Sequence, residues 1–422
     1  MTLLFVNAKQ VVTCAGAARA RVGSEMRDCG VLGESAVAVE GARIAAVAGR
    51  VALERAYPDA TVFDCGGGVL TPGLVDSHTH AIFGKPRYEE QERRAAGADY
   101  MEIARQGGGI HASVRDVRAR DADELFALAR PRLMRLASYG TTTVEVKSGY
   151  GLSIADELKQ LRVIRRLAAE LPLRIVPTWL GAHEIPREAR STPATRASYV
   201  KMLRDEMLPL VVAEHLARFA DVFCEPGVFT IEESRDLLLA ARSSGLALKL
   251  HADELAPSGG AELAAELRAT SADHLAAISP GGIRALASSG TVATLLPGTM
   301  LFLGKGTRPP ARALLDAGAA VALATDFNPG TSPTTNLPFI LTLAVSELHM
   351  SVAESILAAT VNGAAALGLA AETGQLAPGY SADLALFDIE DIRELPYWYA
   401  DRRCKRTWVR GKACDPTDLP IT

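Results

Sequence analysis

Short apolar runs alternate with helical stretches from about residue 72 to about residue 373. Most of these runs are rich in Val, Ile, Leu and Thr and end at Gly, Pro or a charged residue, which is typical of buried strands. The pattern predicts strands at residues 69–76, 142–146, 174–180, 221–224, 247–251, 270–273, 292–296 and 321–325.

Helical periodicity fills the intervals between these strands. It predicts helices at residues 154–170, 231–243, 261–267 and 283–288, and a long apolar helix at 353–366 closes the region. Strands that alternate with helices over roughly 300 residues favour an α/β fold, a (β/α)8 TIM-like barrel at 72–373. A doubly wound parallel sheet is the competing arrangement.

The two chain ends have a different pattern, of short strands and tight turns. Residues 1–71 contain apolar strands and a hairpin around Gly41, and residues 374–422 contain two more strand candidates at 382–388 and 407–412. The mixed, charged segment 16–33 is interpreted as a loop. Because neither end can bury a core alone, we expect both ends to form one small β-sandwich domain that the barrel interrupts.

The composition is that of an ordinary soluble protein of 422 residues, with 48% hydrophobic residues and a net charge of -4. Nothing in it suggests nucleic acid or a membrane as partner, and neither a signal peptide nor an apolar run of ~18 residues is present. The six cysteines form no CxxC pair, so we expect free thiols and a cytoplasmic location.

Histidines gather where predicted strands end, and in a barrel of this kind the active site lies at those ends. His78 and His80, two residues apart, project from one face of an extended strand. A single histidine is more often a packed core residue, but five at strand ends favour a metal site. His111, His215 and His349 are interpreted as surface or packing residues, the last two on helices. The strand-end set is His78, His80, His183, His251 and His274.

An economical set of metal ligands is three of these histidines and one carboxylate. Zinc and ferrous iron both accept imidazole nitrogen and carboxylate oxygen, so the set leaves zinc or iron open. One divalent ion with a free position for water would supply hydroxide near neutral pH. The predicted ligands are His78, His80, His251 and Asp326.

Further polar residues lie in the loops after the strands. Glu254 and His274 could move protons, although a helix-cap role for Glu254 and a supporting role for His274 are the alternatives. Arg87 could clamp a carboxylate and Tyr150 could donate a hydrogen bond, although surface arginines and packing tyrosines are common.

Two lysines belong to the inward phase of their strands. Lys249 lies two residues before His251, and Lys147 lies two residues after Glu145, with which it could form an ion pair inside the barrel. Some barrel hydrolases bridge two metals with a carboxylated lysine. The fourth strand, 221–224, offers no lysine, so one metal is favoured.

Eight segments together resemble the amidohydrolase superfamily and, within it, the imidazolonepropionase family. The HxH pattern with a distant His and Asp is specific only to the superfamily, whereas KSGYG, KLHADE and TDFNPG together are specific to the narrower family. The segments are PGLVDSHTH at 72–80, GGGI at 107–110, EVKSGYGL at 145–152, LGAH at 180–183, DVFCE at 221–225, KLHADE at 249–254, SADHL at 271–275 and ATDFNPG at 324–330.

The resemblance implies metal-dependent hydrolysis of the ring amide C–N bond of 4-imidazolone-5-propanoate to N-formimino-L-glutamate, in histidine degradation. It also implies a homodimer and a small-molecule substrate. Proton transfer would fall to Glu254 and His274, with Asp326 as a further candidate for the base. The residues that would hold the substrate are Arg87, Tyr150, His183, Glu254, Asn328, Gly330 and Thr331.

The chain departs from the family pattern at Gln91, at Glu184 and Ile185, in segment 16–33 and at residues 397–399. None of these is a proposed ligand. Two rival functions remain: a related ring hydrolase or deaminase with another substrate clamp, and a scaffold protein that has lost its metal. The second predicts missing ligands, and all four are present.

Overall fold

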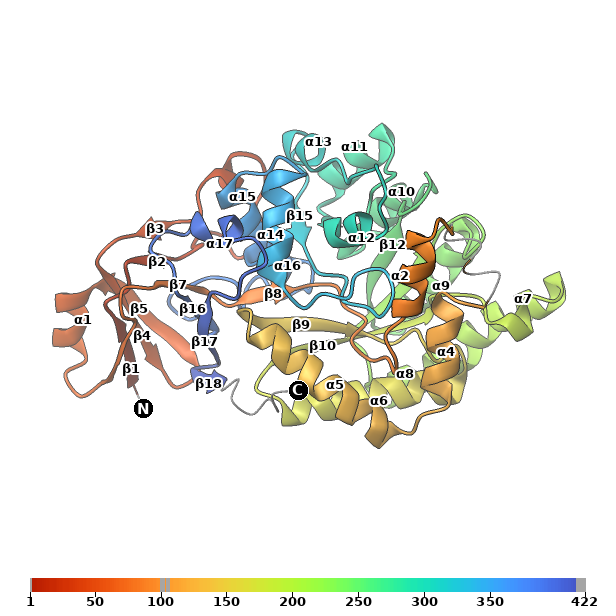
Figure 1. Cartoon of the computed structure of the whole chain (residues 1–422), viewed down its shortest axis with the longest axis horizontal. Coiled ribbons are helices and arrows are strands. Elements are labelled where there is room, and N and C mark those ends of the chain that lie inside the picture. The colour runs from red at the N-terminus through yellow and green to blue at the C-terminus, as the bar shows by residue number, and fades with distance from the viewer. Residues whose placement is uncertain (1, 99–102, 104–106, 415–422) are drawn as a thin grey trace.

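A barrel of eight parallel strands, surrounded by helices, forms the larger part of the molecule (Figure 1). The computed structural model describes residues 2–98, 103 and 107–414. Each barrel strand pairs with the next in chain order, and hydrogen bonds from Asp326 N to His78 O and from His80 N to Phe327 O join the segments that directly follow the first and the last strand. The (β/α)8 prediction is confirmed, and the doubly wound sheet is excluded. The strands are β8 (Leu74–Asp76), β9 (Thr141–Lys147), β10 (Arg174–Ala182), β11 (Phe219–Cys224), β12 (Ala247–Ala252), β13 (Ser271–His274), β14 (Val292–Leu295) and β15 (Val321–Leu323).

The predicted strand 69–76 is two strands, because the chain changes partner at Gly73. β7 (Val69–Pro72) pairs with a strand near the C-terminus, and β8 pairs with β9. Gly73 N donates to Asp383 O, whereas Leu74 N donates to Gly140 O. A Cβ at Gly73 would overlap the Thr142 side chain, so only glycine fits at this crossing.

Helices cover the outside of the barrel. The predicted helices 154–170 and 231–243 have these bounds, and the other two short ones shift by one to three residues at their ends. His215 and His349 are exposed, as expected, but each follows a helix in a left-handed conformation (φ 51° and 55°) rather than lying on it. Among the described residues no helix is long and apolar enough to cross a membrane. The helices around the barrel are α2 (Tyr88–Ala95), α4 (Ile110–Arg118), α5 (Ala122–Ala137), α6 (Ile154–Glu170), α7 (Pro193–Met202), α8 (Leu208–Ala213), α9 (Ile231–Ser243), α10 (Gly260–Glu266), α11 (Pro280–Ser289), α12 (Pro297–Phe302), α13 (Ala311–Asp316) and α14 (Leu337–Ser346).

The prediction of one helix at 353–366 is wrong. The segment forms α15 (Val352–Ala358) and α16 (Val361–Ala365), and the helix breaks at Thr360 (φ -128°, ψ -89°). Ala359 O accepts a hydrogen bond of 2.8 Å from Val75 N, so the carbonyl at the break is bound by β8. Apolar composition alone did not distinguish one buried helix from two.

Gly363→Ala should lower the free energy of unfolding by about 1–3 kcal/mol, as overpacking typically does. The reason is that a Cβ at Gly363 would lie 2.9 Å from Val75 O in β8. Urea denaturation followed by circular dichroism measures the change. The matched control is Gly49→Ala, where a Cβ meets nothing within 4 Å. Equal stability of the two variants would contradict the tight packing at Gly363.

The chain ends together build a β-sandwich beside the barrel, at the left of Figure 1. One sheet has the order β5-β4-β1-β6 and the other β18-β17-β16-β7-β2-β3, so three strands from each end share the second sheet. Phe5, Leu70, Leu384 and Trp408 belong to one buried cluster that fills the sandwich. The strands are β1 (Thr2–Val6), β2 (Gln10–Val12), β3 (Val31–Leu32), β4 (Ser35–Glu40), β5 (Arg43–Gly49), β6 (Thr61–Asp64), β16 (Leu384–Phe387), β17 (Cys404–Val409) and β18 (Lys412–Cys414).

Segment 16–33 is not only a loop. It contains a short 3-10 helix at Gly23–Arg27 and the strand β3, which pairs with β2. Two short helices, α1 (Arg50–Ala56) and α17 (Glu394–Tyr397), were not predicted. Asn362 of α16 accepts a hydrogen bond from Arg21 N and donates one to Arg21 O, so this segment is held against the barrel. The six cysteines are free thiols, as expected.

Candidate metal centre and active site

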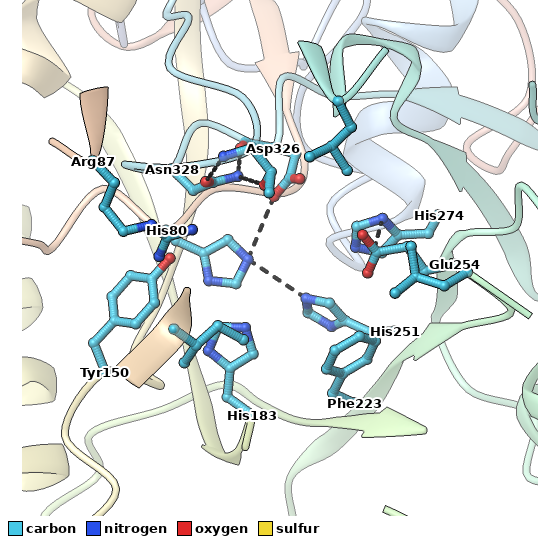
Figure 2. A pocket seen from close by; sticks show the side chains of 14 residues that line it. His80, Arg87, Tyr150, His183, Phe223, His251, Glu254, His274, Asp326 and Asn328 are labelled. Carbon is cyan, nitrogen blue, oxygen red and sulfur yellow. Dashed lines mark hydrogen bonds and ion pairs between the residues drawn. The ribbon is translucent and has the colours of Figure 1, made fainter. Parts of the chain in front are cut away.

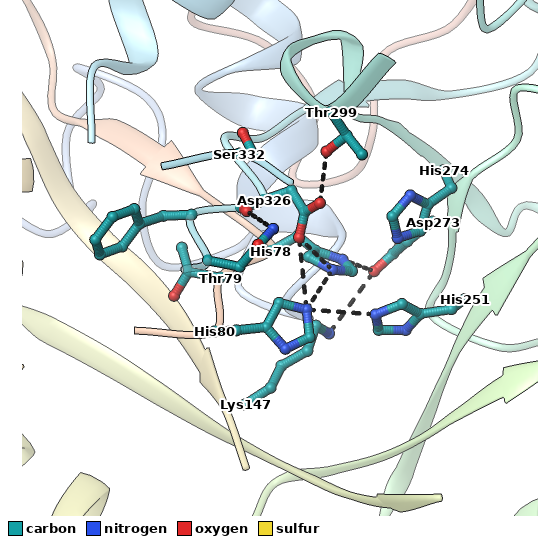
Figure 3. A network of polar contacts seen from close by, with 12 residues as sticks. His78, Thr79, His80, Lys147, His251, Asp273, His274, Thr299, Asp326 and Ser332 are labelled. Atoms are coloured by element: carbon teal, nitrogen blue, oxygen red, sulfur yellow. Dashed lines mark hydrogen bonds and ion pairs between the residues drawn. The ribbon is translucent and has the colours of Figure 1, made fainter. Parts of the chain in front are cut away.

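Five histidines and Asp326 converge at the ends of the barrel strands, and all six are buried (Figure 2, Figure 3). His78 and His80 follow β8, His251 lies in β12, and His274 ends β13. His274 (φ 81°) and Asp326 (φ 51°) have left-handed backbones, which non-glycine residues rarely adopt. These backbone conformations direct both side chains inward, towards the other histidines, and they are strained.

The spacing of the nitrogen and oxygen atoms fits a single ion. His80 Nε2 lies 3.3 Å from His78 Nε2, 3.5 Å from His251 Nε2 and 3.5 Å from Asp326 Oδ1. His78 Nε2 is likewise 3.5 Å from Asp326 Oδ1. Ligands about 2.0–2.1 Å from a tetrahedral zinc are separated by about 3.3–3.4 Å, so the set has the dimensions of a metal centre.

The orientation of the rings also favours a cation. His78 Nδ1 lies 2.7 Å from Asp273 Oδ2, and His251 Nδ1 lies 3.0 Å from Asp221 Oδ2. A carboxylate only accepts, so each of these Nδ1 atoms carries the proton and each Nε2 presents a lone pair. His78 Nε2 and His251 Nε2 both direct a lone pair at His80 Nε2, at 3.3 and 3.5 Å. A proton on His80 Nε2 satisfies only one of them, whereas a cation between the three nitrogens attracts every lone pair.

Protonation states match this arrangement. Burial lowers the pKa of His78, His80 and His274 well below the usual value, so their imidazoles are neutral, the form that binds metal. Burial raises the pKa of Asp326 to about 6, and a hydrogen bond of 2.5 Å donated by Thr299 to Oδ2 opposes that rise (Figure 3). The bond leaves Oδ1 directed at the histidines.

A fully buried charge network supports the predicted ligands from inside the barrel. Lys147 Nζ lies 2.8 Å from Glu145 and 2.8 Å from Asp221. The ion pair with Glu145 was predicted from the sequence, and the one with Asp221 was not. Lys249 Nζ lies 3.3 Å from Glu145 and 3.5 Å from Asp273. Burial would lower the pKa of Lys147, but the carboxylates of Asp221, Glu145 and Asp273 hold it above its usual value.

Asp221 and Asp273 were not predicted from the sequence to be partners of the predicted metal ligands. Asp273 was visible only as the neighbour of His274, and strand alternation placed it on the opposite face. The left-handed backbone of His274 brings both side chains inward. Asp221 could have been found from the sequence, because strand alternation places it on the same face as Phe223, two residues later on a predicted strand.

A pocket opens above the histidines, with two different sides (Figure 2). Arg87 and Tyr150 lie on one side of His80, and Glu254 and His274 lie on the other. Arg87 Nη1 donates to Ser113 Oγ at 3.0 Å, and its Nε lies 3.3 Å from Glu90 Oε2. The predicted site residues that line the pocket are His80, Arg87, Tyr150, His183, His251, Glu254, His274, Asp326, Asn328 and Thr331.

Two predicted site residues do not line this pocket. His78 is fully buried beneath it, and Gly330 lies behind Arg87. A Cβ at Gly330 would overlap the Arg87 guanidinium, so this glycine makes room for the arginine. Asn328 Oδ1 accepts hydrogen bonds from Gly330 N at 2.9 Å and from Thr331 N at 2.7 Å, which fixes the loop after β15.

An apolar wall was missed. Phe223 lies beside His183 and His251, with ring centroids 6.2 and 5.7 Å away. Ile110, Leu255 and Leu303 complete the wall. Phe223 shares the inward phase of its strand and could have been found, whereas the other three come from segments outside the strands, which no periodicity relates to the pocket.

The departures from the family pattern lie outside the pocket lining. Glu184 forms a 2.5 Å ion pair with Arg190, and Ile185 is buried. Gln91 lies on α2, and Tyr397, Trp398 and Tyr399 are exposed.

Comparisons with known proteins agree with this geometry. The model of the amidohydrolase family matches residues 84–414. An imidazolonepropionase of Symbiobacterium thermophilum is 48% identical over 94% of this chain and 93% of its own length, and one of Shouchella clausii is 45% identical over 97% and 92%. Among solved structures, an adenosine deaminase from Xanthomonas campestris with bound zinc has the same fold, with a TM-score of 0.72 at 20% identity over 97% of this chain and 92% of its own.

Fold, site geometry and sequence identity over nearly the whole chain lead to one assignment. The chain belongs to the amidohydrolase family and, within it, to the imidazolonepropionases.

Proposed function

We propose that this enzyme hydrolyses the ring amide C–N bond of 4-imidazolone-5-propanoate to N-formimino-L-glutamate, in histidine degradation. The observation that carries the proposal is the two-sided pocket: Arg87 lies across the histidine cluster from Glu254 and His274 (Figure 2). A substrate with a carboxylate at one end and a cleavable ring at the other matches this separation of charge and proton-transfer groups.

His78, His80, His251 and Asp326 would hold one divalent metal ion per subunit, zinc or iron. When bound, such an ion polarises the carbonyl group and makes water available as hydroxide near neutral pH. Zinc is bound in the adenosine deaminase of similar fold, and the ligand set suits iron equally. A second ion beside Glu145 and Asp273 is disfavoured, because the ammonium of Lys147 lies 2.8 Å from Glu145 and 3.8 Å from Asp273.

The side of the pocket with Arg87 would hold the substrate. Arg87 would bind the propanoate through its guanidinium, and Tyr150, His183, Asn328 and Thr331 would donate or accept hydrogen bonds around the ring. Gly330 would act through its backbone and through the room it leaves for Arg87. Burial lowers the pKa of His183 to about 3, so its ring enters these contacts neutral.

The other side would move protons. Glu254 Oε2 lies 3.7 Å from His274 Nδ1, so the two side chains can share the task. Burial, followed by the charges of Asp326 and Glu225, raises the pKa of Glu254 well above its usual value. A carboxylate of raised pKa is a stronger base, suited to taking a proton from the attacking water and passing it to the leaving nitrogen.

A direct assay tests the proposal. Purified protein is incubated with 4-imidazolone-5-propanoate, N-formimino-L-glutamate is identified by mass spectrometry, and metal content is measured on the same sample. Product formation that depends on bound metal is the expected result. Bound metal without turnover would contradict the proposed substrate, and other cyclic amides or a deamination reaction would then be tested.

Arg87→Lys should raise KM about 10- to 100-fold and change kcat much less, because the ammonium keeps the charge but loses the bidentate contact. Steady-state kinetics with 4-imidazolone-5-propanoate give the two constants. A substrate analogue with a propanamide group serves as the control, since its KM should be similar in the native enzyme and the variant. An unchanged KM for the propanoate would contradict this role of Arg87.

We also propose that the enzyme acts as a homodimer, as the family resemblance implies, and in the cytoplasm, as the six free cysteines suggest. Sedimentation equilibrium tests the dimer directly, because a subunit has a mass of 44.7 kDa. A mass of one subunit across the micromolar range would contradict it.

A further inference from the structure

Glu225, the first residue after β11, holds the loop that carries Glu254. It is 3% exposed, and its carboxylate accepts hydrogen bonds from three successive backbone N–H groups, those of Glu254 (3.1 Å), Leu255 (3.2 Å) and Ala256 (2.8 Å). The loop between β12 and α10 contains no helix or strand of its own. A side chain just beyond the end of the neighbouring strand therefore supplies the hydrogen bonds that regular structure would otherwise provide.

Glu157 of α6 plays the same part for the loop after β9. It is fully buried, and its carboxylate accepts from Gly149 N (3.0 Å), Gly151 N (2.7 Å) and Leu152 N (2.9 Å). Gln160, one turn further along α6, accepts from Tyr150 N at 3.0 Å. Four successive amides of this loop thus end on two side chains of one helix.

The second loop also reaches His183. Its Nδ1 lies 2.9 Å from Gly149 O, and a carbonyl only accepts, so the ring donates from Nδ1 and presents Nε2 to the pocket. The orientation of Tyr150 and of His183 depends on the same backbone segment that Glu157 holds.

Three amides that converge on one carboxylate fix three peptide planes, and hence the direction in which the side chains leave the backbone. Hydrogen bonds to an ionised acceptor are about twice as strong as neutral ones. A glutamine at either position has one acceptor oxygen, and its NH2 group would face N–H donors. The substitution therefore leaves at least one buried amide without a partner while the side-chain volume hardly changes.

We propose that Glu225 and Glu157 are positioning residues with separate effects on the reaction. Glu225 acts through Glu254 and sets the rate of proton transfer, and Glu157 acts through Tyr150 and His183 and sets the affinity for substrate. This inference rests on the proposed function, because it uses the roles given there to Glu254 and to the two ligand-binding residues. The two loops lie on different sides of the pocket (Figure 2), so their effects can be separated.

The kinetic test compares Glu225→Gln with Glu157→Gln. Displacement of a catalytic group by about 1 Å lowers the rate up to about 10²-fold. Glu225→Gln should therefore lower kcat about 10- to 100-fold with KM within about threefold. Glu157→Gln should raise KM about 10-fold with kcat within about threefold. The matched control is Glu354→Gln, because Glu354 is a buried helix-capping carboxylate outside the pocket lining, and it should change neither constant.

A double variant separates positioning from general stability. If Glu225 acts through Glu254, adding Glu225→Gln to Glu254→Gln should cause no further loss of kcat, whereas independent effects would multiply. The proposal would be overturned if both single variants changed kcat and KM to the same extent. It would also be overturned if the two losses of kcat multiplied fully in the double variant.

Hydrogen–deuterium exchange of the native protein and the variants tests the same inference without substrate. Glu225→Gln should speed exchange in peptides that span residues 254–256, and Glu157→Gln in peptides that span 149–152, each without change in the other loop. Unchanged exchange in both loops would overturn the positioning roles. If the native enzyme fails to hydrolyse 4-imidazolone-5-propanoate while the exchange pattern appears as expected, the proposed function fails and the anchoring of the loops stands.

Discussion

His251→Asn should lower kcat/KM by about 10⁴-fold or more, because a metal centre that loses a ligand loses several kcal/mol of transition-state stabilisation. His251 Nε2 lies 3.5 Å from His80 Nε2, and Asp221 Oδ2 lies 3.0 Å from the other ring nitrogen, Nδ1. The substitution removes the imidazole from the set and leaves Asp221 with Lys147 and the backbone N–H of residue 251 as partners. The enzyme should be purified with far less than one metal ion per subunit.

Metal content by mass spectrometry and activity on the same sample measure this effect. His215→Asn is the matched control, because His215 is an exposed histidine after α8 and should leave both quantities unchanged. Dialysis of the native enzyme against a chelator should reproduce the loss, and adding zinc or iron should restore the native enzyme only. A fully active His251→Asn variant would show that the reaction does not depend on this centre.

The positions of the barrel strands were predictable because buried parallel strands leave an apolar signal that breaks at their ends. That signal placed His183, His251 and His274 at the rim, and alternation placed Lys147 and Lys249 inside. Each of these inferences needs only local rules, the period of the strand and the turn that follows it.

What the sequence did not reveal depends on contacts between distant segments. The division of strand 69–76 at Gly73 follows from two different partners, Asp383 and Gly140. The break at Thr360 follows from the hydrogen bond between Ala359 and Val75. Neither appears in a pattern of apolar positions, because both concern the direction of a backbone group and not the burial of a side chain.

The site had its own unpredictable part. The left-handed backbones of His274 and Asp326 cost about 1–3 kcal/mol each and persist only where surrounding structure imposes them. The anchoring role of Glu225 was equally hidden, since its three amide partners lie 29 to 31 residues further along the chain. Sequence patterns located the residues with reactive or metal-binding side chains, and tertiary structure determines the orientation of those side chains.

Glu254→Gln should lower kcat by about 10² to 10⁴-fold, the usual contribution of general acid–base catalysis, with a smaller change in KM. The amide keeps the size of the side chain but cannot take a proton. In the native enzyme the carboxylate must be ionised to act as base, and burial with the nearby charges of Asp326 and Glu225 raises its pKa above the usual value. Activity should therefore fall as the pH is lowered through that raised pKa.

The pH profile distinguishes loss of the base from loss of structure. kcat is measured from pH 5 to pH 9 together with metal content, and the residual activity of Glu254→Gln should lack the acidic limb of the native profile while metal content stays the same. Glu232→Gln, an exposed glutamate in the first turn of α9, should keep both kcat and the native profile. If Glu254→Gln retains kcat within about threefold, the proton must pass through His274 or Asp326, because both side chains also line the pocket, Asp326 as a proposed metal ligand and His274 next to the ligands.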